Sequence, residues 1–106
     1  MKILLPVTGK DSEIISDNFG RCEYFLLINQ DEYSYIHNDN LDLVNGAGVK
    51  SAQLVIDLEI DVVIVPKLGE KASKLLKLAD VEIYKSISRN LNENLELFKE
   101  NKLQSL

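Results

Sequence analysis

A short, unbroken apolar run lies between two segments of helical periodicity in the second half of the chain, and this arrangement restricts the fold most. The run is Val62–Val65, which Pro66 follows. Apolar residues recur at helical spacing on either side of it: Val49, Ala52, Val55 and Ile56 before, and Ala72, Leu75, Leu76 and Ala79 after. Residues 81–84 form a further strand-like run. Strands that alternate with helices predict a central sheet covered on both faces.

The first half of the chain predicts three more strands. Lys2–Val7 is typical of a buried strand. The apolar run 24–28 and the alternating run 33–37 flank a polar turn, which predicts a hairpin. Residues 8–20 carry turn chemistry without periodicity, so we expect a loop there.

The C-terminal segment predicts a third helix. Asn90 and Glu93 stand at the spacing of a capping box, and Leu91, Leu95 and Phe98 recur along one face. We expect the residues after Lys99 to fray.

These elements predict one α/β domain over residues 1–106, with three layers in the order α/β/α. Right-handed crossovers make the third, fourth and fifth strands parallel. We therefore expect a five-stranded mixed sheet of order 3-2-1-4-5, counted along the chain, in which only the second strand is antiparallel to the others.

Charge and composition exclude two classes of partner. The net charge of −5 leaves no surplus of cations to displace phosphate counterions, which argues against nucleic-acid binding. No apolar stretch approaches the length of a membrane span, and the apolar run that follows Met-Lys at the start is too short for a secretory signal. We therefore expect a cytoplasmic protein without a membrane partner.

The candidate site follows from the topology, because ligands bind outside the carboxyl ends of parallel strands. The reversed second strand brings its amino end, with Arg21 and Cys22, to that same edge. Gly46 and Gly48 open the first helix and Gly69 precedes the second, where unpaired amides attract anions. The glycines can equally serve tight turns alone. The Walker and dinucleotide-binding spacings are absent, which disfavours a nucleotide.

Four segments resemble one known family: "MKILLPV", "NFGRCEYFLLI", "NGAGVKSAQLVIDLEIDVVIVPKLGEKA" and "VEIYKS". They resemble the dinitrogenase iron-molybdenum cofactor biosynthesis family, of the NifX and NifY type, which also forms the C-terminal part of NifB. The resemblance covers nearly the whole chain. It implies a ribonuclease H-like fold and, for the nitrogenase members, transient carriage of an iron-sulfur cluster precursor. The family commonly has His before Phe-Gly-Arg as a plausible cluster ligand, where this chain has Asn18.

Two interpretations of the single cysteine stay open. Cys22 is either a small buried hydrophobe or a reactive, metal-binding thiol, whose pKa Arg21 and nearby helix N-termini should lower if it faces the crevice. One thiolate tethers only one edge of a cluster, so sulfides, a dimer partner or external thiols would complete the coordination. Arg21 either clamps an anion or pairs with Asp17 or Glu23. His37 is expected on an edge strand with a structural role.

The sequence favours a carrier over an enzyme. No carboxylate lies inside Lys2–Val7, where a two-metal nuclease of the implied fold would need one, and no nucleophile and base stand in evident partnership.

We expect a non-enzymatic carrier or accessory protein, a monomer or weak homodimer with cofactor-assembly proteins as partners. It would transiently bind an iron-sulfur or iron-molybdenum-type cluster, or a small anion. The expected site residues are Asn18, Gly20, Arg21, Cys22, Gly46, Gly48 and Gly69, with Cys22 as the metal ligand. The alternative is a protein-interaction or regulatory module that has lost the cluster site.

Overall fold

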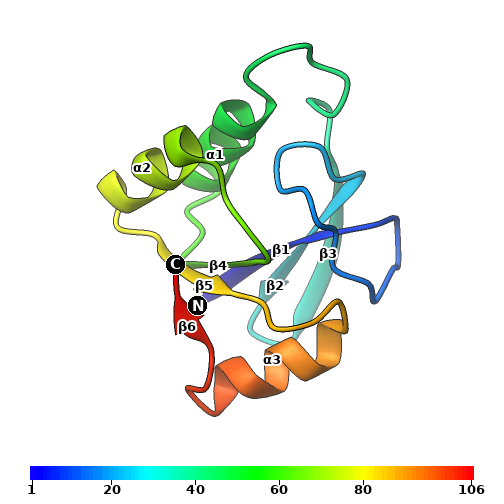
Figure 1. The fold of residues 1–106 in the computed structure, drawn as a ribbon. Coiled ribbons are helices and arrows are strands. Elements are labelled where there is room, and N and C mark those ends of the chain that lie inside the picture. Colours follow the sequence, from blue (N-terminus) through cyan, green and yellow to red (C-terminus); the bar gives the residue numbers. More distant parts are fainter.

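The computed structural model describes all 106 residues and contains three helices and one mixed sheet. The strands are β1 (Lys2–Val7), β2 (Tyr24–Asn29), β3 (Glu32–His37), β4 (Val62–Val65), β5 (Glu82–Lys85) and β6 (Gln104–Ser105). The helices are α1 (Ala47–Asp57), α2 (Glu70–Leu78) and α3 (Leu91–Lys99). Figure 1 shows α1 and α2 on one face of the sheet and α3 on the other, so the three predicted layers are present.

The strand order is β3-β2-β1-β4-β5-β6. β1 pairs in parallel with β4, and β4 with β5, whereas β2 is antiparallel to both of its neighbours. The predicted order of the first five strands and the reversal of the second are therefore confirmed. The reversal brings the chain that enters β2 to the edge where β1 and β4 end.

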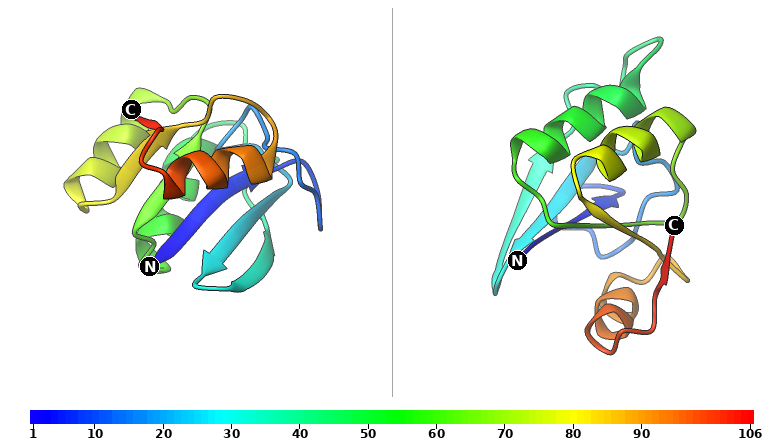
Figure 2. Two further views of the ribbon diagram at one scale, coloured as in Figure 1. Left: turned by 90° about the horizontal axis from the view of Figure 1, so that it is seen from below. Right: turned by 90° about the vertical axis from the view of Figure 1, so that its left-hand side faces the viewer.

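Two apolar clusters hold the layers together. One lies between the sheet and the pair α1 and α2, around Leu4, Phe25 and Val63. The other lies between the sheet and α3, around Leu5, Leu26 and Ile64. The right-hand view of Figure 2 shows the sheet between the pair α1 and α2 above and α3 below. Because β1, β2 and β4 supply side chains to both clusters, their sequences are apolar at almost every position.

The prediction of five strands with a frayed tail is wrong, because the tail forms a sixth strand. Asn101 takes a left-handed conformation (φ 58°) after α3, and the amide of Lys102 donates to the carbonyl of Leu97. This Schellman-type ending turns the chain back toward the sheet. Leu103 is then buried under α3, and β6 pairs with β5 in antiparallel register.

The other two helices end in the same way. Glu59 and Asp80 have left-handed backbones (φ 57° and 60°), and the amides of Ile60 and Val81 donate to carbonyls five residues earlier. Both Ile60 and Val81 are buried, two residues before β4 and one residue before β5 respectively. None of the three helices is long and apolar enough to cross a membrane.

We predict that Leu103→Ala lowers the free energy of unfolding by about 2 kcal/mol, because it removes a largely buried side chain (8% exposed) and leaves a cavity under α3. Leu78→Ala is the matched control. That side chain is 76% exposed, so its loss should cost less than about 0.5 kcal/mol. Equilibrium denaturation in urea measures both values. Equal, small effects would contradict the docked position of the C-terminal segment.

Candidate functional site

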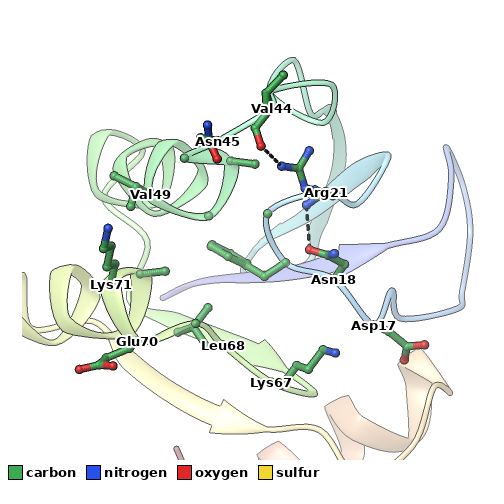
Figure 3. Close-up of a pocket in the computed structure, with 17 residues that line it drawn as sticks. Asp17, Asn18, Arg21, Val44, Asn45, Val49, Lys67, Leu68, Glu70 and Lys71 are labelled. Carbon is green, nitrogen blue, oxygen red and sulfur yellow. Dashed lines mark hydrogen bonds between the residues drawn. The ribbon is translucent and has the colours of Figure 1, made fainter.

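Three loops at the carboxyl edge of the sheet enclose a cleft of about 680 Å³. Residues 17–21 enter β2, residues 44–49 open α1, and residues 67–72 connect β4 to α2. Figure 3 shows these loops on three sides of the space. Six of the seven predicted site residues line this cleft: Asn18, Gly20, Arg21, Gly46, Gly48 and Gly69. The seventh, Cys22, does not.

Two helices direct their N-termini into this cleft without a side-chain cap. α1 begins after Gly46, which has a left-handed backbone (φ 79°), and α2 begins after Gly69. The first helical amide with a partner is that of Lys50 in α1 and that of Ser73 in α2. The three preceding amides of each helix make no hydrogen bond within the protein. In α3, by contrast, the side chain of Asn90 accepts a hydrogen bond from Glu93. The cleft is therefore lined by unpaired donors at the positive ends of two helix dipoles.

Gly20 allows the entry to β2 to lie directly against α1. A Cβ atom at this position would be 2.7 Å from the amide nitrogen of Gly48 and 2.9 Å from its Cα. Both atoms belong to the backbone, so they cannot move aside as a flexible side chain would. The absence of a side chain at Gly20 thus sets how closely this turn approaches α1.

The charged side chains that line the cleft have a net positive charge, although the chain as a whole is acidic. Arg21, Lys67 and Lys71 are opposed by Asp17 and Glu70. Asp17 forms an ion pair with Arg89, so part of its charge is already neutralised. Neither lysine forms an ion pair. The cleft is thus electrostatically suited to an anion. The sequence analysis did not identify the two lysines, although both lie beside Gly69.

Arg21 lies at the cleft but donates its hydrogen bonds to a neighbouring loop. Its Nη1 donates to the carbonyl of Leu41 (3.1 Å) and its Nη2 to that of Val44 (3.2 Å). Neither of the ion pairs that the sequence suggested, with Asp17 or with Glu23, forms.

Two asparagines shape the turn before β2. The Oδ1 atom of Asn18 accepts a hydrogen bond from the amide of Arg21 (3.1 Å), which closes the turn over Gly20. The sequence analysis missed Asn38, which is fully buried. Its Nδ2 donates to the carbonyls of Gly20 (3.0 Å) and Cys22 (2.9 Å), so it joins the end of β3 to this turn. The only feature of the sequence that could have pointed to Asn38 is its position directly after the predicted edge strand.

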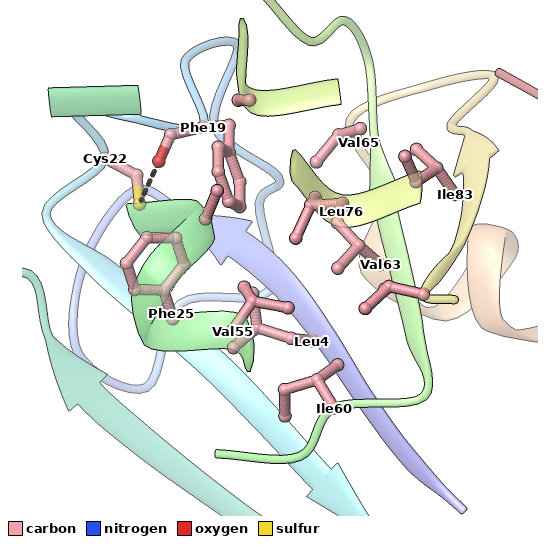
Figure 4. Packing of buried hydrophobic residues seen from close by; sticks show 13 residues of the cluster. Leu4, Phe19, Cys22, Phe25, Val55, Ile60, Val63, Val65, Leu76 and Ile83 are labelled. Atoms are coloured by element: carbon pink, nitrogen blue, oxygen red, sulfur yellow. Dashed lines mark hydrogen bonds between the residues drawn. The ribbon is translucent and has the colours of Figure 1, made fainter. Parts of the chain in front are cut away.

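Cys22 belongs to the apolar cluster under α1 (Figure 4) and is only 2% exposed. Its thiol donates to the carbonyl of Phe19 (3.5 Å). Burial raises the pKa of Cys22 from 9.0 to about 12, and the side chain of Asn38 opposes this only in part. The thiol does not face the cleft, so the condition for a lowered pKa is not met. Of the two interpretations, the structure shows the packed cysteine.

His37 lies on the edge strand β3, as the alternation predicted. Its ring packs edge-on against Tyr24, and its Nδ1 atom lies 2.9 Å from a carboxylate oxygen of Asp39. No three side chains of His, Cys, Asp or Glu lie close enough together to hold a metal ion. The donors gathered at the cleft are nitrogen groups that suit an anion, and not a cage for a bare cation.

Comparisons with known proteins agree with this architecture. A family model described as dinitrogenase iron-molybdenum cofactor matches residues 1–101. An uncharacterised protein of Methanocaldococcus jannaschii is 31% identical over 109 residues, which are 98% of this chain and 90% of that protein.

Solved structures show the same fold. The apo form of the orange protein from Desulfovibrio gigas superposes with a TM-score of 0.90 at 19% identity, over 99% of this chain and 92% of that one. A candidate NifB protein from Thermotoga gives a TM-score of 0.83 at 28% identity, over 99% and 92%. At 19% identity the first likeness concerns the fold alone.

We predict that Gly20→Ala lowers the free energy of unfolding by about 2 kcal/mol, because the new methyl group overlaps the backbone of α1. Gly48→Ala is the matched control on the other side of the contact. Its Cβ would lie 3.9 Å from that of Ala72, an ordinary contact, and alanine favours the helix by about 0.5 kcal/mol. Thermal or urea unfolding separates the two. A Gly20→Ala protein as stable as the unmodified chain would contradict the close approach.

We predict that iodoacetamide alkylates Cys22 about a thousandfold more slowly in the folded protein than in urea at pH 8. With a pKa of about 12, only about one thiol in ten thousand is ionised at this pH. The folded-state rate should keep rising with pH beyond 10, where an unfolded thiol has already reached its plateau. Mass spectrometry of timed samples measures both rates. Rapid labelling of the folded protein would contradict the buried position.

Proposed function

Because the chain belongs to the dinitrogenase iron-molybdenum cofactor family, we propose that it binds an anionic metal–sulfur cluster, or a small anion of related chemistry, in the cleft. In this role it acts as a carrier or accessory protein of cofactor assembly and not as an enzyme. The cluster is cargo that arrives from and leaves to other proteins.

The observation that supports this proposal best is the convergence of two uncapped helices on one cleft. Six amides, three from each helix, have no partner in the protein. Backbone amides at a helix N-terminus bind anions by hydrogen bonding and through the helix dipole, and each charge-assisted hydrogen bond contributes about 1.5–3 kcal/mol. Two such ends at one cleft favour a ligand that presents several acceptors at once.

The remaining lining residues fit the surface of a sulfide-rich cluster. Lys67 and Lys71 supply positive charge without an ion-pair partner. Val44, Val49 and Leu68 supply apolar contact, which suits large, polarisable sulfur atoms. Since Cys22 is sealed under α1, the protein in this conformation offers no thiolate. The cargo must therefore bring its own sulfides and arrive as a complete anion, held by hydrogen bonds and charge.

An interaction module remains the second candidate, and one position favours it. Where the family commonly has His, Asn18 is engaged in closing the turn before β2. A chain that binds no anion under the conditions below would support this candidate.

We predict that Gly69→Asp raises the stability of the protein while it lowers the affinity for tetrathiomolybdate at least tenfold. Gly69 has an extended backbone (φ −64°, ψ 155°), and a Cβ there meets nothing within 4 Å, so the new side chain fits. Its carboxylate accepts hydrogen bonds from the first turn of α2 and stabilises the helix by about 0.5 kcal/mol. The amides are then no longer available to the anion.

Two control variants separate the causes. Gly69→Asn caps the helix without adding charge, and Gly69→Ala does neither. Affinity should fall in the order Ala, Asn, Asp, measured anaerobically from the visible absorption of the bound anion after dialysis. Reconstitution with iron and sulfide should follow the same order and should survive Cys22→Ala. Equal affinity in all three variants, or loss of the bound chromophore in Cys22→Ala, would refute binding by the helix ends.

A further inference from the structure

The middle of the loop between β3 and α1 is joined to the rest of the protein by hydrogen bonds from one side chain, that of Arg21. Residues 40–45, here called the strap, make two kinds of hydrogen bond. Those within the loop are local: the amides of Asn40, Leu41 and Leu43 all bond to atoms of Asn38 or Asn40. The only hydrogen bonds that join the strap itself to residues outside the loop are the two from Arg21, to the carbonyls of Leu41 and Val44.

One end of the strap is fixed to the rest of the protein, and the other end can act as a hinge. Asn38 before it is fully buried and bonded to Gly20 and Cys22, so that end is fixed. Gly46 after it has a left-handed backbone and open space around its Cα, so that end can change its dihedral angles at little cost. Between these two ends, the guanidinium of Arg21 supplies the hydrogen bonds that hold the strap in place.

The same guanidinium borders the cleft, where Figure 3 shows it turned toward Val44. Its present acceptors are two neutral carbonyls. Because the guanidinium is a cation, these bonds are already charge-assisted. An anionic acceptor adds the attraction between two opposite charges and can accept two parallel bonds from the guanidinium. Once an anion is bound by the helix ends, Arg21 has a better acceptor within the same cleft.

We propose that Arg21 is a ligand-responsive latch, which holds the strap through Leu41 and Val44 in the free protein and releases it when an anion enters the cleft. This inference rests on the proposed function. Val44 and Asn45 form part of the wall of the cleft, so release changes the surface next to the cargo. By linkage, a ligand that frees the strap must bind more tightly to a protein in which the strap is already free and the cation is kept.

A spin label on the strap tests the latch. Asp42 is exposed and lies outside the cleft, and Cys22 is buried with a pKa of about 12, so a nitroxide attaches selectively to Asp42→Cys. The label is introduced into the unmodified chain and into Arg21→Lys, which keeps the charge but lacks the planar fork whose two nitrogens donate to Leu41 and Val44. Glu96→Cys on α3 carries the control label, on the opposite face of the sheet. Spectra are recorded with and without tetrathiomolybdate, whose visible absorption shows how much is bound.

In the chain with Arg21, the label at position 42 should be restricted without the anion and mobile at saturation. In Arg21→Lys it should be mobile in both states, and the control label should not respond. Arg21→Gln, which loses the charge as well, should bind the anion about tenfold more weakly. A strap that stays as restricted or becomes more so at saturation overturns the latch, and so does an Arg21→Lys strap as restricted as the original.

The two proposals fail in different ways. If no variant binds the anion, the proposed function and the response to ligand both fall, while the spectra without anion still decide whether Arg21 holds the strap. If the anion binds and the spectra do not change, the cleft is an anion site and the latch alone is wrong.

Discussion

The contact between Gly20 and the first turn of α1 is the constraint on which the site depends. With only a hydrogen at this position, the turn that enters β2 lies against the backbone of Gly48. Asn38 fastens the same turn to the end of β3. The chain entering a reversed strand is thereby joined to the start of a helix from the next crossover. α1 and α2 pack against each other and so bring the two uncapped ends together, and this joint adds the wall formed by residues 17–21 that completes the cleft.

Topology was accessible from the sequence, because it follows from few and strong constraints. A wholly apolar run such as Val62–Val65 needs cover on both faces, and a hairpin before a crossover forces one reversed strand. The ends of helices were less accessible. Glu59 and Asp80 take left-handed conformations that usually belong to glycine, so their positions give little signal in the pattern. Asn101 is a residue type that does end helices in this way, and the sequence analysis missed that signal. The missed sixth strand follows from the last of these.

The candidate site shows the same division between placement and direction. The edge rule placed Gly46, Gly48 and Gly69 correctly around one cleft, since it concerns only where strands end. It could not tell where a side chain points. Cys22 precedes the first paired residue of β2, where the alternation of faces does not yet hold, and it turns inward. Arg21 donates to carbonyls of a loop that begins about twenty residues later in the chain, and no pattern in the neighbouring sequence predicts an acceptor so distant.

The burial of Cys22 also bears on how a cargo would leave. A cluster bonded to a thiolate departs only by ligand substitution at a metal, which ties its release to the nucleophilicity of the acceptor. A cluster held by amides and ammonium groups breaks no metal–sulfur bond on departure. Its residence time then depends on ionic strength and on competing anions, because both screen the same attraction. Delivery from such a cleft is a matter of electrostatic competition, and the cargo emerges with its coordination intact.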